Sequence, residues 1–226
     1  MQTLRNGSVT GSVMLCQRLL NKKGATPRLR EDGIFGPRTH AAVLSFQARE
    51  RIAQDGAVGP TTWSRLGLTI DITHPVQRFG QPTGTSCWSA AATIIVGNMS
   101  VGPGAAALDP GGGMLPGPEN IRRFADSMGW RMHYPQTWSV SGLRFLLQRK
   151  PVWAVGGGAG FLHAIVLSAM WSDGAEDASG TMIRIHDPWP VNQGSIYARF
   201  YRGTTEGLTP YGAQFDFLTM YVLEPV

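Results

Sequence analysis

A chain of 226 residues is long enough for one large domain or two small ones, and 42% hydrophobic with 15% charged residues is typical of a globular protein. The longest apolar stretches, around residues 90–96 and 164–169, are too short to cross a bilayer, so no membrane-spanning segment is predicted. Residues 1–70 hold 10 Lys and Arg against 4 Asp and Glu, a net charge of +6, whereas residues 71–226 hold 10 against 11, so the chain's net charge of +5 comes from the first part. It could attract an anionic polymer, such as a bacterial envelope, or simply keep the protein soluble. Because the basic residues are scattered and not interleaved with aromatic ones, no nucleic-acid partner is predicted.

Residues 1–70 are predicted to form a small all-α domain of three helices. Apolar residues at helical spacing predict a first helix around 13–20 and a second from about Pro37 to Arg51. A third, short helix is expected over Pro60–Leu66, because proline suits the first turn of a helix. Cys16 lies within the apolar pattern of the first helix, so we interpret it as a buried core residue.

The motif D-G-x-x-G-P-x-T occurs twice in this domain, at residues 32–39 and 55–62. Aspartate accepts local backbone N–H bonds, each glycine permits a tight turn, and proline starts a helix. The two copies therefore predict two turns of one kind, each followed by a helix. The repeat alone indicates an architecture rather than a ligand.

This region resembles the peptidoglycan-binding domain of many bacterial wall hydrolases, a small three-helix module. The resemblance covers nearly all of residues 4–68. Besides the two D-G-x-x-G turns, it rests on Val13, Leu19, Leu20, Ala42, Val43, Phe46, Gln47, Thr62, Trp63 and Leu66. It implies binding to the peptide or glycan part of the bacterial wall, although some members serve as inhibitory or spacer domains. We expect a peptidoglycan partner for residues 1–70 and a second domain over 71–226.

Cys87 opens the most informative part of the second domain. Polar and Gly/Pro-rich residues end there, and an apolar, helix-forming run to Val96 begins at once. With Ser86 as candidate N-cap, Cys87 would lie in the first turn of a buried helix, where unpaired N–H groups and the helix dipole favour the nucleophilic thiolate. Gln81, six residues earlier, could place its amide beside the sulfur and stabilise a developing oxyanion. Alternatively, Cys87 packs in a core helix and Gln81 is an ordinary loop residue.

A candidate base and its orienting group follow later in the chain. His163 comes after the glycine-rich stretch 156–160 and opens an apolar strand, which suits a base at a rigid edge with room for substrate. Asp187 ends a further strand, and its carboxylate could bond the other ring nitrogen, fix the tautomer and stabilise the imidazolium. Asn192 is a second candidate for that orienting role, and His186 is a poorer base because it alternates to the opposite strand face. A buried strand histidine and a turn-starting Asp-Pro pair remain alternative interpretations.

The order Gln81, Cys87, His163, Asp187, with Trp directly after Cys, resembles papain-like cysteine peptidases, especially bacteriocin-leader-processing peptidases and avirulence proteases of plant pathogens. The shared pattern spans roughly residues 77–226: a Cys-Trp helix start, a Gly-rich stretch before an H-A-I-V strand, and a D-P-W strand end. The resemblance implies an α+β fold with a helical half bearing Cys87 and an antiparallel-sheet half bearing His163 and Asp187. It also implies Cys87 as nucleophile, His163 as general acid and base, Asp187 as orienter and Gln81 in the oxyanion hole.

Other features of the sequence give no positive assignment. No metal or cofactor is predicted, because the histidines are dispersed and neither an H-x-x-x-H or C-x-x-C pair nor a phosphate-loop or dinucleotide motif is present. Residues 101–118, rich in Gly, Pro and Ala, do not map onto the papain-like family. They are interpreted as a lid, a substrate-side loop or a disordered connection.

These patterns lead to three hypotheses for function. The first is a peptidoglycan hydrolase, an amidase or endopeptidase that cleaves a stem-peptide amide through an acyl-enzyme while the N-terminal domain raises the local substrate concentration. The second is a papain-like protease acting on a protein, and the third is a non-catalytic wall-binding protein. The intact Gln–Cys–His–Asp set counts against the third, and the pairing of domains favours the first by association.

The first residues contain no apolar signal segment, so we expect secretion without a signal peptide. This favours an antibacterial effector that is cytoplasmic before a dedicated secretion machine delivers it, and that acts in the periplasm or cell wall of a target bacterium. An immunity protein that blocks the cleft would then protect the producer. A phage or host lysin released through a holin is another route.

Overall fold

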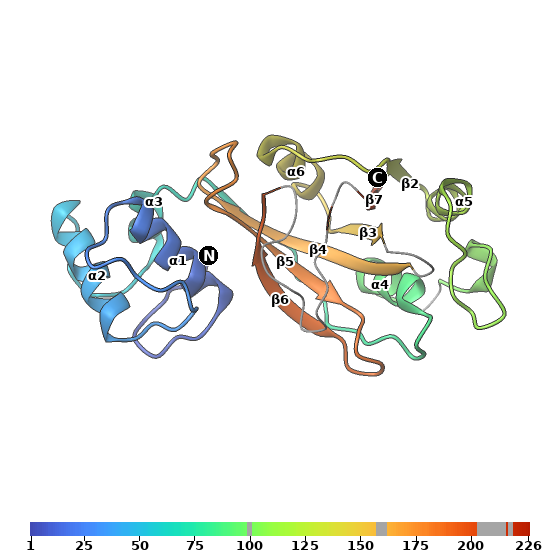
Figure 1. Cartoon of the computed structure of the whole chain (residues 1–226), viewed down its shortest axis with the longest axis horizontal. Coiled ribbons are helices and arrows are strands. Elements are labelled where there is room, and N and C mark those ends of the chain that lie inside the picture. Colours follow the sequence, from blue (N-terminus) through green and yellow to red (C-terminus); the bar gives the residue numbers. More distant parts are fainter. Residues whose placement is uncertain (99–100, 157–161, 203–215, 217–218) are drawn as a thin grey trace. The chain divides into compact units, whose positions relative to one another are not determined.

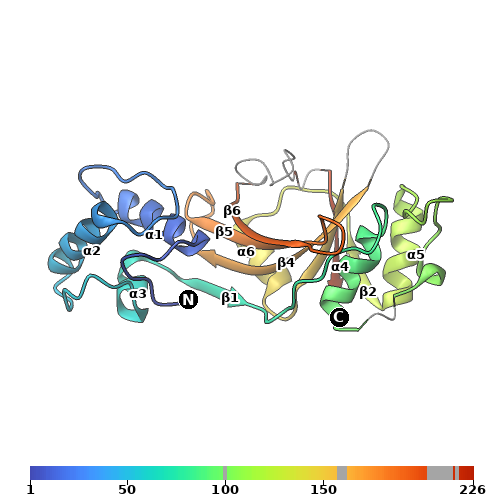
Figure 2. The ribbon, with the colours of Figure 1, turned by 90° about the horizontal axis from the view of Figure 1, so that it is seen from below.

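The computed structural model describes residues 1–98, 101–156, 162–202, 216 and 219–226. By its internal contacts the chain divides into two compact units: Met1–Asp71 with Trp171–Met182, and Ile72–Met170 with Ile183–Val226. Helices α1 to α3 belong to the first unit, and α4 to α6 accompany a sheet in the second (Figures 1 and 2). This confirms the predicted α+β class with an N-terminal all-α domain. Within the described ranges, no helix combines the length and apolar character needed to cross a membrane.

The first unit contains the three predicted helices, α1 (Gly11–Lys22), α2 (Pro37–Arg49) and α3 (Pro60–Leu66). Pro37 and Pro60 occupy the first turn of α2 and α3, where the missing N–H has no intrahelical partner to lose. Helix α2 ends before Arg51, its predicted last residue, which adopts a left-handed conformation with φ of 55°. The buried core is formed by Leu4, Val13, Leu15, Cys16, Leu19, Leu20, Phe35, Val43, Phe46, Trp63 and Leu66.

The first copy of the repeated turn is tied to helix α1 by one buried glutamine. Gln17 Nε2 donates to Asp32 Oδ1 at 2.9 Å, to the carbonyl of Ile34 at 3.1 Å and to Thr39 Oγ1 at 3.1 Å. Its Oε1 accepts from the backbone N–H of Gly33 at 3.0 Å, and Gly33 has a φ of 77° that a side chain would strain. The bond from Gln17, followed by that from the Ile34 N–H, holds the pKa of Asp32 below its usual value.

The second copy repeats this network on helix α2. Gln47 Nε2 donates to Asp55 Oδ1 at 2.8 Å, to the carbonyl of Ala57 at 2.8 Å and to Thr62 Oγ1 at 3.2 Å. Its Oε1 accepts from the N–H of Gly56 at 3.0 Å. The repeat therefore includes a buried glutamine that precedes each Asp-Gly turn, and its role is to bind that turn to the preceding helix.

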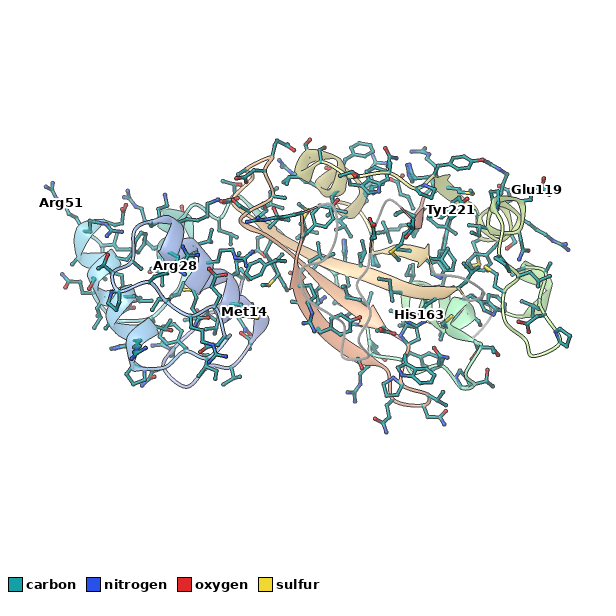
Figure 3. All side chains as sticks on the ribbon, in the orientation of Figure 1. Met14, Arg28, Arg51, Glu119, His163 and Tyr221 are labelled. Atoms are coloured by element: carbon teal, nitrogen blue, oxygen red, sulfur yellow. The ribbon has the colours of Figure 1, made fainter. Side chains whose placement is uncertain are left out.

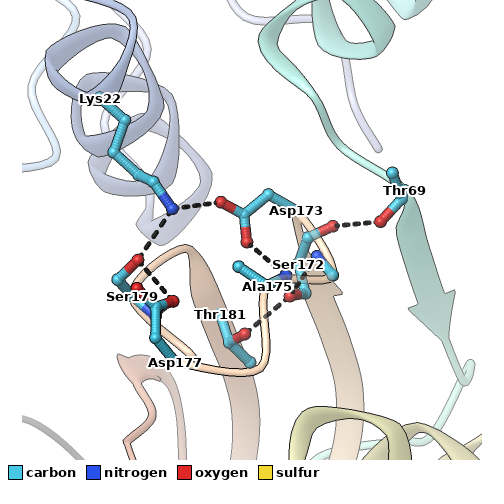
Figure 4. Close-up of polar contacts among 9 residues, drawn as sticks. Lys22, Thr69, Ser172, Asp173, Ala175, Asp177, Ser179 and Thr181 are labelled. Carbon is cyan, nitrogen blue, oxygen red and sulfur yellow. Dashed lines mark hydrogen bonds and ion pairs between the residues drawn. The ribbon is translucent and has the colours of Figure 1, made fainter.

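The tip of a hairpin, Trp171–Met182, belongs to the first unit by its contacts. Lys22 Nζ, at the end of α1, forms an ion pair with Asp173 Oδ2 at 2.5 Å and donates to Ser179 Oγ at 2.8 Å (Figure 4). The N–H of Thr69 donates to the carbonyl of Ser172 at 2.9 Å. The three-helix module thus includes a piece of chain that lies about 100 residues further along the sequence, the Thr69–Ser172 bond spanning 103 positions.

Among the residues that the structure describes, the sheet has seven strands: six in the order β2-β7-β3-β4-β5-β6, and β1 paired to β4. Their bounds are β1 (Ile70–Thr73), β2 (Trp130–His133), β3 (Val152–Gly156), β4 (His163–Ser172), β5 (Thr181–Asp187), β6 (Ser195–Phe200) and β7 (Tyr221–Pro225). Strands β3 and β4 run antiparallel, with Val152 opposite Leu167 and Gly156 opposite His163. The side chains of β3 and β4 are almost all buried, so the middle of the sheet is covered on both faces.

Helices α4 (Cys87–Val96), α5 (Pro118–Met128) and α6 (Val140–Leu147), with the short 3-10 helix η1 (Pro103–Ala105), complete the second unit. An aromatic cluster joins α4 and α5 to the sheet. The Phe124 ring centroid lies 5.7 Å from that of Trp88, 5.1 Å from that of Trp153 and 6.1 Å from that of Trp130. Such rings bury a large apolar area and prefer edge or tilted contacts, so this cluster fixes α4 against β3.

Replacing Gln47 with Ala should destabilise the first unit. The substitution leaves the Gly56 N–H and the Ala57 carbonyl without their buried partner, so we expect a loss of about 2–4 kcal/mol in the free energy of unfolding. Urea unfolding followed by circular dichroism measures the change. Gln54→Ala, an exposed glutamine in the same unit, is the control and should stay within about 0.5 kcal/mol of the native chain. Equal stability of both variants would contradict the structural role of the network.

Candidate active site

Helix α4 holds Cys87 at its first residue, as the sequence predicted. The run after Cys87 is apolar and buries Ala90, Ala91, Ala92 and Ile94, and the helix ends at Gly97, which adopts a φ of 75°. The start of the helix is anchored because Trp153 Nε1, on β3, donates to the carbonyl of Trp88 at 3.1 Å. The Cys87 residue is 6% exposed, so the candidate nucleophile is nearly buried.

His163 is the first residue of β4 and lies beside the start of α4 (Figures 1 and 3). Its Nε2 lies 2.8 Å from Asp187 Oδ1, and the imidazole also forms a hydrogen bond with the Cys87 side chain. Because Nε2 bonds the carboxylate, Nδ1 is the nitrogen left for the sulfur. The Cys87 sulfur also lies 3.6 Å from the carbonyl oxygen of Leu162. Of the glycine stretch predicted to precede His163, residues 157–161 lie outside the described part.

Asp187, the last residue of β5, is 1% exposed and surrounded by donors. Its Oδ1 faces His163 and also accepts from the backbone N–H of Trp189 at 2.9 Å. Its Oδ2 accepts from the hydroxyl of Tyr197 at 3.0 Å. These contacts replace the hydrogen bonds to water that a buried carboxylate loses.

The pKa of His163 is raised to about 10. Burial opposes the charged imidazolium and lowers the value, but the hydrogen bonds to Asp187 and to Cys87 favour the charged form and outweigh it. His163 therefore keeps its proton at neutral pH. Its contribution to folding stability is complete below its ordinary pKa of 6.5 and is lost as the pH rises through about 10. A protonated imidazole is the partner that a cysteine thiolate requires.

Gln81 is buried, with 1% of its surface exposed, and joins the loop before α4 to the loop after β5. Its backbone N–H donates to the carbonyl of Pro188 at 2.9 Å, and its own carbonyl accepts from the N–H of Asn192 at 2.9 Å. Its side-chain Nε2 donates to the carbonyl of Thr83 at 2.6 Å. Gly80 permits this approach, because a Cβ there would lie 2.3 Å from the backbone nitrogen of Gln193. The oxyanion role of Gln81 stays a prediction.

Two details of the sequence interpretation need correction. Ser86 occupies the N-cap position of α4, but its side chain makes no capping bond. Its hydroxyl instead accepts from the N–H of Thr83 at 3.0 Å and donates to the carbonyl of Thr83 at 3.2 Å. Asn192 is exposed at a turn, with φ of 61°, and the carboxylate of Asp187 occupies the orienting position that Asn192 was also considered for.

His186 follows the predicted strand alternation. It is 2% exposed, and burial followed by the positive charge of Arg184 lowers its pKa to about 4. It is therefore neutral at physiological pH. Its neighbour Asp187 provides the contact to His163.

The unmapped segment 101–118 folds beside the start of α4. Trp88 Nε1, one residue after Cys87, donates to the carbonyl of Gly112 at 3.1 Å. The carboxylate of Asp109 closes the turn by accepting from the N–H of Gly111 at 2.7 Å. The segment is therefore an ordered part of the fold next to the candidate nucleophile rather than a disordered connection.

Tyr197 and the backbone N–H of Trp189 are the site groups that the sequence analysis missed. Both bond Asp187, ten and two residues further along the chain. The D-P-W segment contained the signal for Trp189, because an aspartate commonly accepts from the N–H two residues later. No local sequence pattern indicated the bond from Tyr197, because the position of Tyr197 opposite Asp187 depends on how strands β5 and β6 pair.

No group of three or more His, Cys, Asp or Glu side chains that could hold a metal ion occurs among the residues the structure describes. The site itself offers a buried sulfur, an imidazole that holds a proton, and a carboxylate that bonds the imidazole. This combination suits nucleophilic attack on an acyl group.

Two family models match the chain. The first, "Putative peptidoglycan binding domain", matches residues 10–66. The second, "Papain-like cysteine protease AvrRpt2", matches residues 68–202 and so covers more than half of the chain. Both agree with the resemblances stated from the sequence.

Similar proteins match over shorter parts. The zinc D-Ala-D-Ala carboxypeptidase of Streptomyces albus G is 40% identical over 65 residues, which are 28% of this chain and 26% of that protein. The crystal structure of a Burkholderia AP3 phage endolysin is 44% identical, with a TM-score of 0.28, over 29% of this chain and 25% of that one.

A fused zinc-dependent amidase/peptidase with a peptidoglycan-binding domain from Clostridium acetobutylicum ATCC 824 is 17% identical, with a TM-score of 0.28. The match covers 92% of this chain and 64% of that one. The chain thus spans less than two thirds of each of these three proteins. On the strength of the family match, the chain belongs to the papain-like cysteine proteases of the AvrRpt2 family and carries a domain of the peptidoglycan-binding family before it.

Proposed function

We propose that this chain is a cysteine-dependent peptidoglycan hydrolase that cleaves an amide bond of the wall stem peptides through an acyl-enzyme. The observation that carries the proposal is the presence, in one chain, of the Cys87–His163–Asp187 constellation and a domain of the peptidoglycan-binding family. The 65-residue match to a curated D-Ala-D-Ala carboxypeptidase supports an association with the wall. A binding domain on the same chain raises the concentration of wall peptide at the active site without any new catalytic contact.

In the proposed first step, the thiolate of Cys87 attacks the carbonyl carbon of the substrate amide. The bond between carbon and nitrogen then breaks, and the imidazolium of His163 gives its Nδ1 proton to the leaving amine. Asp187 keeps the ring in place through the 2.8 Å contact to Nε2. The result is a thioester between Cys87 and the acyl part of the substrate.

In the second step, neutral His163 takes a proton from a water molecule, which attacks the thioester and releases the acid. The thiolate and the imidazolium are then restored. We propose that Gln81 contributes to the oxyanion hole in both steps. Its amide nitrogen carries two protons, and the hydrogen bond to the carbonyl of Thr83 uses one, so the other can face a developing negative charge.

A second candidate is a protease that acts on a protein, with the N-terminal domain serving only to target it. The description of the matching family, which names a protease, favours this candidate. The two candidates share the same chemistry and differ only in the substrate. They are therefore separated by digestion products and not by the geometry of the site.

Cys87→Ala should abolish the release of stem-peptide fragments from purified sacculi, with a decrease of at least about 10³-fold, because it removes the nucleophile. Mass analysis of the soluble fragments measures release and identifies the bond that is cut. Cys16→Ala is the matched control, because Cys16 is fully buried in the other unit, and it should retain activity. Cleavage of casein-like substrates by the native chain, with sacculi left intact, would reject the wall-hydrolase proposal in favour of the protein protease.

Asp187→Asn should lower kcat by roughly 10²- to 10⁴-fold and move the alkaline limb of the activity profile to lower pH. The pKa of His163 is about 10, and its bond to Asp187 is the largest of the causes that raise it. Without the negative charge, the imidazolium loses its proton at a lower pH. Activity measured across pH tests the shift, with Asp126→Asn, an exposed aspartate on α5, as control. An alkaline limb that moved upward would contradict the proposed roles.

We propose that the enzyme acts in the periplasm or wall of a target bacterium, as an antibacterial effector whose producer holds a neutralising immunity protein. The wall-binding family match supports the location of the substrate. Expression confined to the cytoplasm should leave cells intact, whereas the same chain directed to the periplasm should lyse them, because peptidoglycan lies outside the inner membrane. Cys87→Ala directed to the periplasm is the control and should be harmless. Equal harmlessness of the native chain in both compartments would count against the proposal.

A further inference from the structure

The carboxylate of Asp187 uses both oxygens, and only one of them faces His163. Oδ2 points to β6, where it accepts from the hydroxyl of Tyr197 at 3.0 Å. This contact lies on the far side of the carboxylate from the imidazole and so has no direct part in bond making. A group placed there can act only by controlling how the carboxylate is held.

Holding that carboxylate matters because a free aspartate rotates readily about its last side-chain bond. With Oδ2 fixed by Tyr197 and Oδ1 fixed by the Trp189 N–H at 2.9 Å, the plane of the carboxylate is set. Oδ1 is then aimed at His163 Nε2. A neutral donor to a buried charged acceptor is also one of the stronger hydrogen bonds of a protein.

The ring of Tyr197 is itself held from the side by a charged group. The guanidinium carbon of Arg199 lies 4.9 Å from the ring centroid, within the range of a cation–π contact. Tyr197 and Arg199 alternate to the same side of β6, so the strand presents both toward the site. The phenol therefore reaches Asp187 from a supported ring on a regular strand rather than from a loop.

We propose that Tyr197 is a positioning residue of the active site, which orients the Asp187 carboxylate and thereby maintains the ion pair between Cys87 and His163. The proposal rests on the proposed roles of those three residues and adds a fourth group from β6 that no motif of the sequence indicated. Substrate does not need to touch Tyr197 for this role, since it acts through Asp187 and His163.

Alkylation of Cys87 by iodoacetamide tests the proposal without any knowledge of the substrate. Only the thiolate reacts, and an ordinary thiol with a pKa of about 8.5 is almost entirely protonated at about pH 6. The native chain should therefore react at this pH much faster than His163→Ala. Tyr197→Phe removes one oxygen and keeps the ring, and it should slow the reaction roughly 3- to 10-fold at about pH 6. At about pH 10 the two rates should converge, because the thiol then ionises without help.

The rate at Cys87 is read by mass spectrometry of the peptide that contains it. Tyr201→Phe is the matched control, because it removes another phenol hydroxyl, which donates to the carbonyl of Trp138 at 2.8 Å and does not reach Asp187. It should leave the ratio of the rates at low and high pH unchanged. A folded Tyr197→Phe that reacts at about pH 6 as fast as the native chain, or faster, overturns the proposal.

Failure of the underlying roles would look different. If the native chain and His163→Ala react equally slowly at about pH 6, the ion pair itself is absent, and the assignment of the three catalytic residues falls with it. If the native chain reacts fast and Tyr197→Phe alone does not differ from it, the three roles stand and only the role of Tyr197 is lost.

Discussion

The chemistry of this site depends on one buried negative charge. Asp187 is 1% exposed, and removing a carboxylate from water is costly unless donors replace the lost solvation. Three donors do so here: the imidazole of His163, the Trp189 N–H and the Tyr197 hydroxyl. Burial lowers the pKa of His163, but its hydrogen bonds to Asp187 and to Cys87 outweigh that effect and raise the pKa to about 10. The proposed roles of Cys87 and His163 therefore depend on how Asp187 is held.

The geometry of two neighbouring strands brings the side chains of the site together. Strands β4 and β5 are neighbours joined by a hairpin. The first residue of β4 and the last residue of β5 therefore lie side by side, at the end of the sheet opposite the hairpin. Those residues are His163 and Asp187. Helix α4 begins at that same end of the sheet, and its start is anchored to β3 by the hydrogen bond from Trp153. The backbone hydrogen bonds of Gln81 also join the loop before α4 to the loop after β5.

The N-terminal unit is built on a different constraint. Two buried glutamines, Gln17 and Gln47, each bind the backbone and side chains of an Asp-Gly turn, and together they satisfy polar groups that the small core cannot leave unpaired. A module of this size has a limited apolar core, so polar networks of this kind contribute much of its specificity of fold. The repeated motif is thus explained by architecture, and the proposal of wall binding rests on the family match to residues 10–66.

Much of the local structure of this protein could be predicted from the sequence alone. Local rules were sufficient for the three N-terminal helices, for α4 beginning at Cys87 and for His163 and Asp187 at strand ends, because apolar spacing, proline and glycine act within a few residues. Local rules also explain the one cap that was misassigned: a serine before a helix can bond either the helix or its own turn, and Ser86 bonds Thr83. The alternation of side chains along β5 correctly predicted that Asp187, and not His186, contacts the imidazole of His163.

Contacts between distant segments could be decided only by the tertiary structure. The pairing of Tyr197 with Asp187, the choice of Asp187 over Asn192 and the inclusion of Trp171–Met182 in the first unit all depend on the register and course of strands. Segment 101–118 is likewise held by a contact from α4, the bond from Trp88 Nε1 to the carbonyl of Gly112, in addition to its own Asp109 turn. Sequence patterns report which side chains share a face of one element, whereas the partner that each face meets is set by how the whole chain packs.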